Sequence, residues 1–151
     1  MSVLGDHFVK IDGVRIHYIE QGKGDPVLLL HGSSFNSRTW EETGTLAAIA
    51  NSGFRAISVD LPGKGLSEKG NFSEDMADFI ERLSDILALD NPILLGASLG
   101  GFVALSFAIS HPKSVRGLIL AGAAFNLIEK QDSLRKLKPI PSLLIWGSED
   151  A

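Results

Sequence analysis

The chain has 151 residues, of which 44% are hydrophobic and 16 are glycine, so it can bury a sizeable core while making many tight turns. Its formal net charge of −4 comes from interspersed acids and bases, and the lack of a basic stripe argues against binding to nucleic acid or to an anionic membrane. Cysteine is absent, which excludes disulfides, a thiol nucleophile and thiolate metal ligands.

No segment predicts export or a membrane span. The N-terminal residues include Asp6 and no long apolar run, which is not the pattern of a secretory signal. The least polar window, 93–109, is shorter than the ~20 residues that a membrane helix needs, and it contains glycines. We therefore expect one domain over residues 1–151, located in the cytoplasm.

The N-terminus predicts a β-hairpin. Residues 7–11 and 14–20 alternate polar and apolar side chains around Asp12-Gly13, a pair typical of a two-residue hairpin turn. His7 and His17 fall in these two strands, and we interpret both as exposed histidines at one edge of a sheet.

The rest of the chain alternates between predicted strands and helices. Short apolar runs indicate strands covered on both faces, and apolar residues at helical spacing indicate helices. The predicted strands are 27–30, 54–59, 92–95, 115–121 and 142–146. The predicted helices are 37–51, which Gly53 ends, a helix capped by Ser73, 99–109 and 126–137. The helix after Ser73 has one apolar stripe, interpreted as its core face: Met76, Phe79, Ile80, Leu83, Ile86 and Leu87.

Two antiparallel strands followed by alternating strands and helices predict an α/β fold. We expect a mostly parallel sheet with helices on both faces and right-handed crossovers. In such sheets ligands bind beyond the carboxyl ends of the strands. The polar residues and glycine predicted at those ends are His31, Asp60, Ser98, Gly122 and Asp150.

Residues 96–100, Gly-Ala-Ser-Leu-Gly, join a predicted buried strand to a predicted buried helix. Such an abrupt turn forces its middle residue toward positive φ and crowds the residues two positions away unless they lack a Cβ. Gly96 and Gly100 meet that demand, so the pattern is typical of a nucleophile elbow and predicts an exposed Ser98 with positive φ. A turn that binds phosphate or closes a tight bend is the alternative interpretation.

The chain resembles the α/β-hydrolase superfamily over the whole length of the chain, and four blocks of sequence carry the resemblance. Within the superfamily the chain is most similar to small cap-less members of the abhydrolase domain-containing 14 type, through His31-Gly32 and the residues that follow, including Phe35, Ser37 and Trp40. The four blocks are 27–32, 60–67, 96–101 and 142–150.

The resemblance implies a role for each matching residue. Ser98 is similar to the nucleophile, and the backbone amides of Leu99 and Ser33 are similar to the two oxyanion donors. Asp150 matches the acid that orients a catalytic histidine, although a disordered terminal carboxylate is the alternative. His31 and Gly32 belong to the loop that shapes the oxyanion hole. The resemblance implies neither a metal nor an organic cofactor.

The chain departs from the family pattern in two ways. Only about one helix fits between Ala121 and Pro139, where the family often inserts a lid, so we expect an open, shallow site. The family's general base follows an eighth strand that this sequence lacks, which suggests a C-terminally truncated hydrolase. His111 would lie roughly 20 Å from Ser98 at the far end of a helix. His31 remains a candidate substitute base at the correct end of the sheet.

The leading functional hypothesis is a serine hydrolase core acting on a small acyl substrate, namely a carboxylic ester, a thioester or a small amide. A non-catalytic binding or interaction module, or an inactive fragment of an enzyme, is the alternative. Residues 142–146 are expected to form an unprotected edge strand, which favours self-association or pairing with a missing C-terminal segment.

Overall fold

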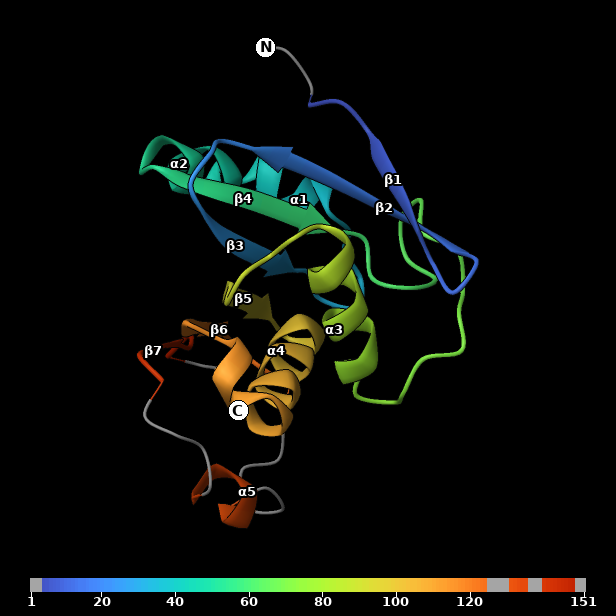
Figure 1. The fold of residues 1–151 in the computed structure, drawn as a ribbon. Helices are drawn as coiled ribbons and strands as arrows, with labels where there is room; N and C mark the ends of the chain where they lie inside the picture. The colour runs from blue at the N-terminus through green and yellow to red at the C-terminus, as the bar shows by residue number, and fades with distance from the viewer. Residues whose placement is uncertain (1–3, 125–130, 136–139, 149–151) are drawn as a thin grey trace.

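A computed structural model describes residues 4–124, 131–135 and 140–148 of the chain. Its seven-stranded sheet has the order β1-β2-β4-β3-β5-β6-β7 (Figure 1). The strands are β1 (His7–Ile11), β2 (Val14–Gln21), β3 (Asp25–Leu30), β4 (Phe54–Val59), β5 (Ile93–Ala97), β6 (Gly117–Ala121) and β7 (Ser142–Ile145). The helices are α1 (Arg38–Glu42), α2 (Thr45–Asn51), α3 (Ala77–Ile86), α4 (Leu99–Ser110), the 3₁₀ turn η1 (Pro112–Ser114) and α5 (Gln131–Arg135).

The strand directions confirm the predicted α/β fold. β2 is antiparallel to β1 and to β4, whereas the pairs from β4 through β3, β5 and β6 to β7 are all parallel. The turn at Asp12 and Gly13 has φ angles of 50° and 82°. Positive φ at both central residues matches the right-handed twist of the flanking strands, which explains why this dipeptide closes the hairpin.

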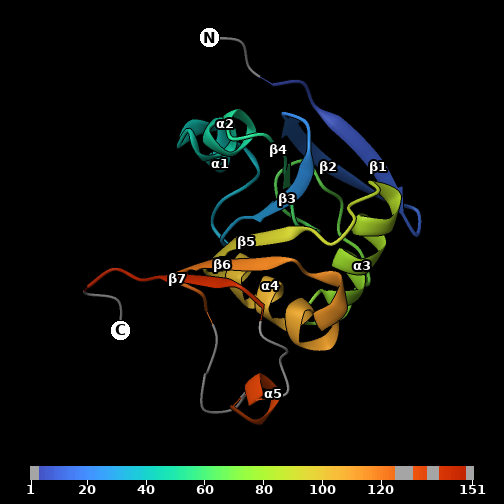
Figure 2. The ribbon, with the colours of Figure 1, turned by 60° about the vertical axis from the view of Figure 1, so that its left-hand side comes forward.

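Helices cover both faces of the sheet. α1 and α2 lie on one face and α3 and α4 on the other (Figures 1 and 2). Alternate side chains of β3 point to opposite faces of the sheet. Val27 and Leu29 pack with Leu46 of α2. Leu28 and Leu30 pack with Phe79 of α3 and with residues of α4. This two-sided burial explains the continuous apolar run in the sequence. None of the described helices combines the length and apolar character needed to cross a membrane.

Two helix predictions need correction. The single helix over 37–51 is wrong, because Gly44 adopts φ 76° and separates α1 from α2. Ser73 is not the cap of α3, which begins at Ala77 after Met76 in the left-handed region. The Ser73 hydroxyl instead donates to the carboxylates of Asp75 and Asp78.

The predicted stripe of α3 is mostly confirmed. Phe79, Ile80 and Leu83 are fully buried and Leu87 is nearly so, but Ile86 is 47% exposed and therefore lies off the core face. Part of the helix expected at 126–137 is present as α5, and residues 125–130 and 136–139 lie outside the described part of the chain.

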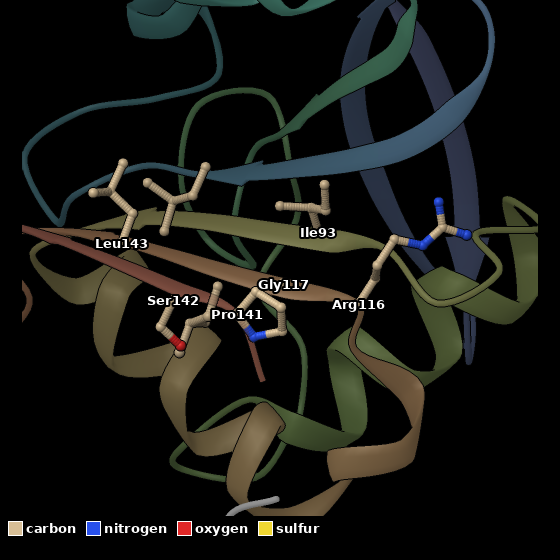
Figure 3. Close-up of a pocket in the computed structure, with 8 residues that line it drawn as sticks. Ile93, Arg116, Gly117, Pro141, Ser142 and Leu143 are labelled. Carbon is tan, nitrogen blue, oxygen red and sulfur yellow. The ribbon is translucent and has the colours of Figure 1, made fainter. Parts of the chain in front are cut away.

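β7 lies at one edge of the sheet, and Leu143, Leu144 and Ile145 are 51–59% exposed. A pocket of about 430 Å³ lies beside it, lined by apolar residues such as Ile93 and Leu143 and by Arg116 (Figure 3). Arg116 immediately precedes β6, so this pocket is near the amino ends of the strands. A substrate site is expected at the opposite, carboxyl ends.

We expect the Leu144→Lys variant to weaken self-association, because an exposed apolar edge strand recruits a second copy and a charge on that edge opposes pairing. Sedimentation velocity over a range of concentrations measures the effect. Ile86→Lys is the matched control, since it removes a similarly exposed apolar side chain from α3 rather than from an edge. A wild-type chain that stays monomeric throughout would contradict the prediction.

Candidate active site

Ser98 occupies the turn between β5 and α4, and its backbone has φ 50° and ψ −115°. The residue is exposed to solvent. Both sequence predictions for Ser98 are therefore confirmed. Three backbone hydrogen bonds hold the turn: the Ser98 amide donates to the Ala121 carbonyl at 3.1 Å, and the Ser98 carbonyl accepts from the amides of Phe102 at 3.1 Å and Ala124 at 3.0 Å.

The two glycines of the elbow are required by backbone contacts. A Cβ on Gly96 would lie 2.2 Å from the carbonyl oxygen of Gly100, and a Cβ on Gly100 would lie 2.0 Å from the carbonyl oxygen of Leu30. Neither contact can be relieved by a side-chain movement, because the opposing atoms belong to the backbone. The glycines thus allow β5, α4 and the end of β3 to meet at Ser98.

The loop after β3 passes directly beside Ser98. A Cβ on Gly32 would lie 3.4 Å from the Cβ of Ser98. The Gly32 carbonyl accepts from the amide of Phe35 at 3.0 Å, so the loop turns back tightly at Ser33 and Ser34. Leu99 is the first residue of α4, and the first amides of a helix have no acceptor within the helix. Leu99 directly follows Ser98 in the sequence, and Ser33 directly follows Gly32, which lies beside Ser98. The role of their two amides as oxyanion donors stays a prediction.

His31 is buried, and both of its ring nitrogens are occupied. Nε2 accepts from the amide of Leu61 at 3.0 Å, so the proton is on Nδ1, which donates to the Gly32 carbonyl at 2.7 Å. Burial, opposed in part by the hydrogen bond to Gly32, lowers the pKa of His31. These bonds support a structural role for His31 beside Gly32 and leave no ring nitrogen to take a proton from Ser98.

His17 is not the exposed strand residue that the alternating pattern predicts, since it is only 1% exposed. Its Nδ1 lies 2.7 Å from Oδ2 of Asp60, and its Nε2 lies 2.6 Å from Oδ1 of Asp6. The available signal was the run Ile16-His17-Tyr18-Ile19, which is apolar on both sides of the histidine and so indicates a segment covered on both faces. His7 is exposed as expected and stacks on Tyr18.

Asp60 lies at the carboxyl end of β4, as predicted, where it binds backbone groups. Its carboxylate accepts from the amide of Ser37 at 2.6 Å and from the amide of Leu66 at 2.9 Å. Burial raises the pKa of this carboxyl, but hydrogen bonds from Ser37, Leu66 and His17 outweigh burial and hold the pKa below its usual value. Asp60 therefore stays ionised and ties together the loops that follow β3 and β4.

His111 is at the far end of α4 from Ser98. Its ring stacks on Phe107 with centroids 4.6 Å apart, and its Nε2 lies 3.6 Å from Glu81. All four histidines of the sequence are described, and none presents a free ring nitrogen to Ser98. Asp150 lies outside the described residues. Within those residues, no cluster of three or more His, Asp or Glu side chains could hold a metal ion.

Comparison with known proteins agrees with this geometry. The family model described as alpha/beta hydrolase fold matches residues 25–140. Mouse ABHD14A is 33% identical over 87% of the chain, which spans 54% of that protein. ABHD14B of Rattus norvegicus, provisionally named a protein-lysine deacylase, is 30% identical over 97% of the chain, which spans 75% of that protein.

A solved structure shows the same fold. A protein of Thermoplasma acidophilum described as a CIB-like hydrolase superposes with a TM-score of 0.89 at 23% identity, covering 97% of this chain and 74% of its own. The family match, the strand order and the elbow at Ser98 agree, so the chain belongs to the α/β-hydrolase family and is a relative of the ABHD14 proteins.

Proposed function

We propose that the chain is a serine hydrolase core that acts on a carboxylic ester, a thioester or a small amide, with Ser98 as the nucleophile. The observation that carries the proposal is the conformation of Ser98, which combines a positive φ with solvent exposure at the carboxyl end of β5. A serine in such a region costs on the order of 1–3 kcal/mol of strain, and residues of this kind cluster at functional sites.

The chemistry follows from the positions around Ser98. Its Oγ attacks the carbonyl carbon of the substrate while a histidine takes the hydroxyl proton, and the amides of Leu99 and Ser33 stabilise the oxyanion that forms. None of the four histidines of this sequence offers a free ring nitrogen to Ser98, so this base has to be supplied by another segment or by added imidazole. The carbon–heteroatom bond then breaks, and the leaving alcohol, thiol or amine receives the proton from the histidine. The base then deprotonates a water molecule, which attacks the acyl-serine; the bond to Oγ breaks, Ser98 receives the proton and the acid is released. Asp150 is proposed to orient the histidine.

A non-catalytic binding module is a second candidate, and one observation favours it. The ring nitrogens of His17 and His31 are committed to other groups, and His7 and His111 stack on aromatic rings away from the elbow. A serine hydroxyl without a base is a weak nucleophile, so the described residues alone do not complete a catalytic site.

Labelling with a fluorophosphonate separates the two candidates. We expect the purified chain to gain one adduct at Ser98, slowly in buffer and faster with added imidazole, because the hydroxyl is exposed and the proposed oxyanion donors are backbone amides next to it in the fold. Intact mass and peptide mapping measure the adduct, and Ser98→Ala is the negative control. A folded chain that takes up no label even with imidazole would favour the binding module.

A further inference from the structure

His17 and its partners form a buried charged cluster that the proposed reaction does not use. A carboxylate only accepts hydrogen bonds, so short contacts to Asp60 and to Asp6 require an N–H on each ring nitrogen of His17. Hydrogen bonds from His17 and then from Arg38 lower the pKa of Asp6, and Asp60 is held ionised by its own partners. The geometry therefore corresponds to an imidazolium between two carboxylates.

On its inner side the cluster holds the loop that passes Ser98. Asp60 binds the amide of Ser37 through Oδ1 and the amide of Leu66 through Oδ2. Ser37 ends the loop that begins at His31 and includes Ser33, and its carbonyl accepts from the hydroxyl of Ser58 at 2.8 Å. His17 neutralises the charge of Asp60, so the same ion pair that satisfies the carboxylate also anchors this loop.

On its outer side the cluster reaches α1 and the N-terminal segment. Asp6 accepts from Arg38 at 2.6 Å, and Arg38 also bonds Glu41 at 2.8 Å and the Leu4 carbonyl at 2.9 Å. α1 follows Ser37 directly, so both ends of the cluster act on one segment.

Four other groups surround His17. The hydroxyl of Ser37 is 3.5 Å from Nδ1, and the ring of Phe8 on β1 is 5.1 Å from the His17 ring, centroid to centroid. The guanidinium of Arg15 lies over that Phe8 ring, 3.8 Å from its centroid, and the Ser67 hydroxyl accepts from the backbone amide of His17. Asp6 and Asp60 are thus the charged groups that contact the ring directly, and both favour the cation.

We propose that His17 is a positioning residue whose imidazolium form, through Asp60, holds segment 31–37 beside Ser98 and so keeps the Ser33 amide in place as an oxyanion donor. Loss of the proton leaves a ring lone pair facing a carboxylate, which removes one hydrogen bond and the ion pair. Replacement of His17 by a neutral side chain should therefore loosen this anchoring. The part concerning Ser33 rests on the proposed function, whereas the anchoring does not.

Amide hydrogen exchange of Ser37 and Leu66 tests the anchoring, because both amides bind Asp60. In His17→Gln we expect their protection relative to core amides of β5 to fall about tenfold, because the ion pair with Asp60 is lost. His7→Gln, which replaces an exposed histidine, should match the wild type. Unchanged protection in His17→Gln would overturn the proposal.

A second variant separates a charged role from simple packing. Asp6→Asn keeps the side-chain volume but removes one anion beside the imidazolium, so the protection of the Ser37 and Leu66 amides should fall. This arm needs only a folded Asp6→Asn chain, so it remains decisive if His17→Gln fails to fold. Protection that stays at the wild-type level would count against the proposal.

The link to reactivity is measured separately. The rate of fluorophosphonate labelling at Ser98 should fall in parallel with Ser37 protection, by at least about tenfold, since one oxyanion donor contributes on the order of 10²–10³ in rate. Absence of labelling in the wild type would contradict the proposed function and leave the exchange result to decide the anchoring. If the labelling rate stays unchanged although protection of the Ser37 amide has been lost, the role assigned to Ser33 is wrong.

Discussion

Hydrolysis of p-nitrophenyl acetate by the chain is expected to be slow in buffer and to rise steeply when a base is supplied. The Ser98 hydroxyl is exposed, but a serine needs a base within about 3 Å to become a useful nucleophile. General-base catalysis is worth about 10²–10⁴ in rate, whereas oxyanion stabilisation and substrate binding alone leave roughly 10³-fold over water. The unaided chain should therefore show a small residual rate.

Two sources of base test this expectation. Imidazole is titrated into the assay, and in a second arm a segment bearing a histidine is fused after Ala151. The rate of ester hydrolysis measured with the Ser98→Ala variant under the same conditions is subtracted in each case, because imidazole hydrolyses the ester by itself. Full, saturable turnover by the unaided chain that is lost in His31→Ala would contradict the prediction and make His31 the base.

The Ser98→Ala variant is expected to lose the whole base-dependent rate and the fluorophosphonate adduct while keeping the far-UV circular dichroism spectrum. The residue is exposed and the turn is held by backbone groups, so removal of the hydroxyl leaves the three hydrogen bonds of the elbow intact. Without the nucleophile an added base has no hydroxyl to activate, so the rate should no longer rise with imidazole beyond the rise that imidazole gives in the absence of the chain.

Ser106→Ala is the matched control for Ser98→Ala. Ser106 lies two turns further along α4 and is 4% exposed, and its hydroxyl has no hydrogen-bond partner among the described residues. Removing a buried hydroxyl without a partner should leave both turnover and stability close to wild type. Equal loss in Ser98→Ala and Ser106→Ala would point to a disturbed helix rather than to a nucleophile.

The elbow and the hairpin could be predicted from the sequence because local geometry decides both. Gly96 and Gly100 stand where a side chain would strike backbone, and Asp12-Gly13 supplies the two positive φ angles of its turn. The parallel sheet was equally accessible, since the apolar run 27–30 must be covered on both faces wherever its neighbours come from. The prediction at Gly100 succeeded through the local strand–turn–helix pattern, although the backbone that a Cβ there would strike belongs to Leu30, far away in the sequence.

The composition and spacing by themselves determined an α/β fold with an exposed serine at the end of a buried strand. Only the tertiary structure decided where His17 lies, because its partner Asp60 is 43 residues away and β4 pairs directly with β2. The same applies to Gly44, whose left-handed conformation divides a helix that composition alone would continue. A pattern of hydrophobic residues specifies which face is buried, but it does not specify which charged groups meet there.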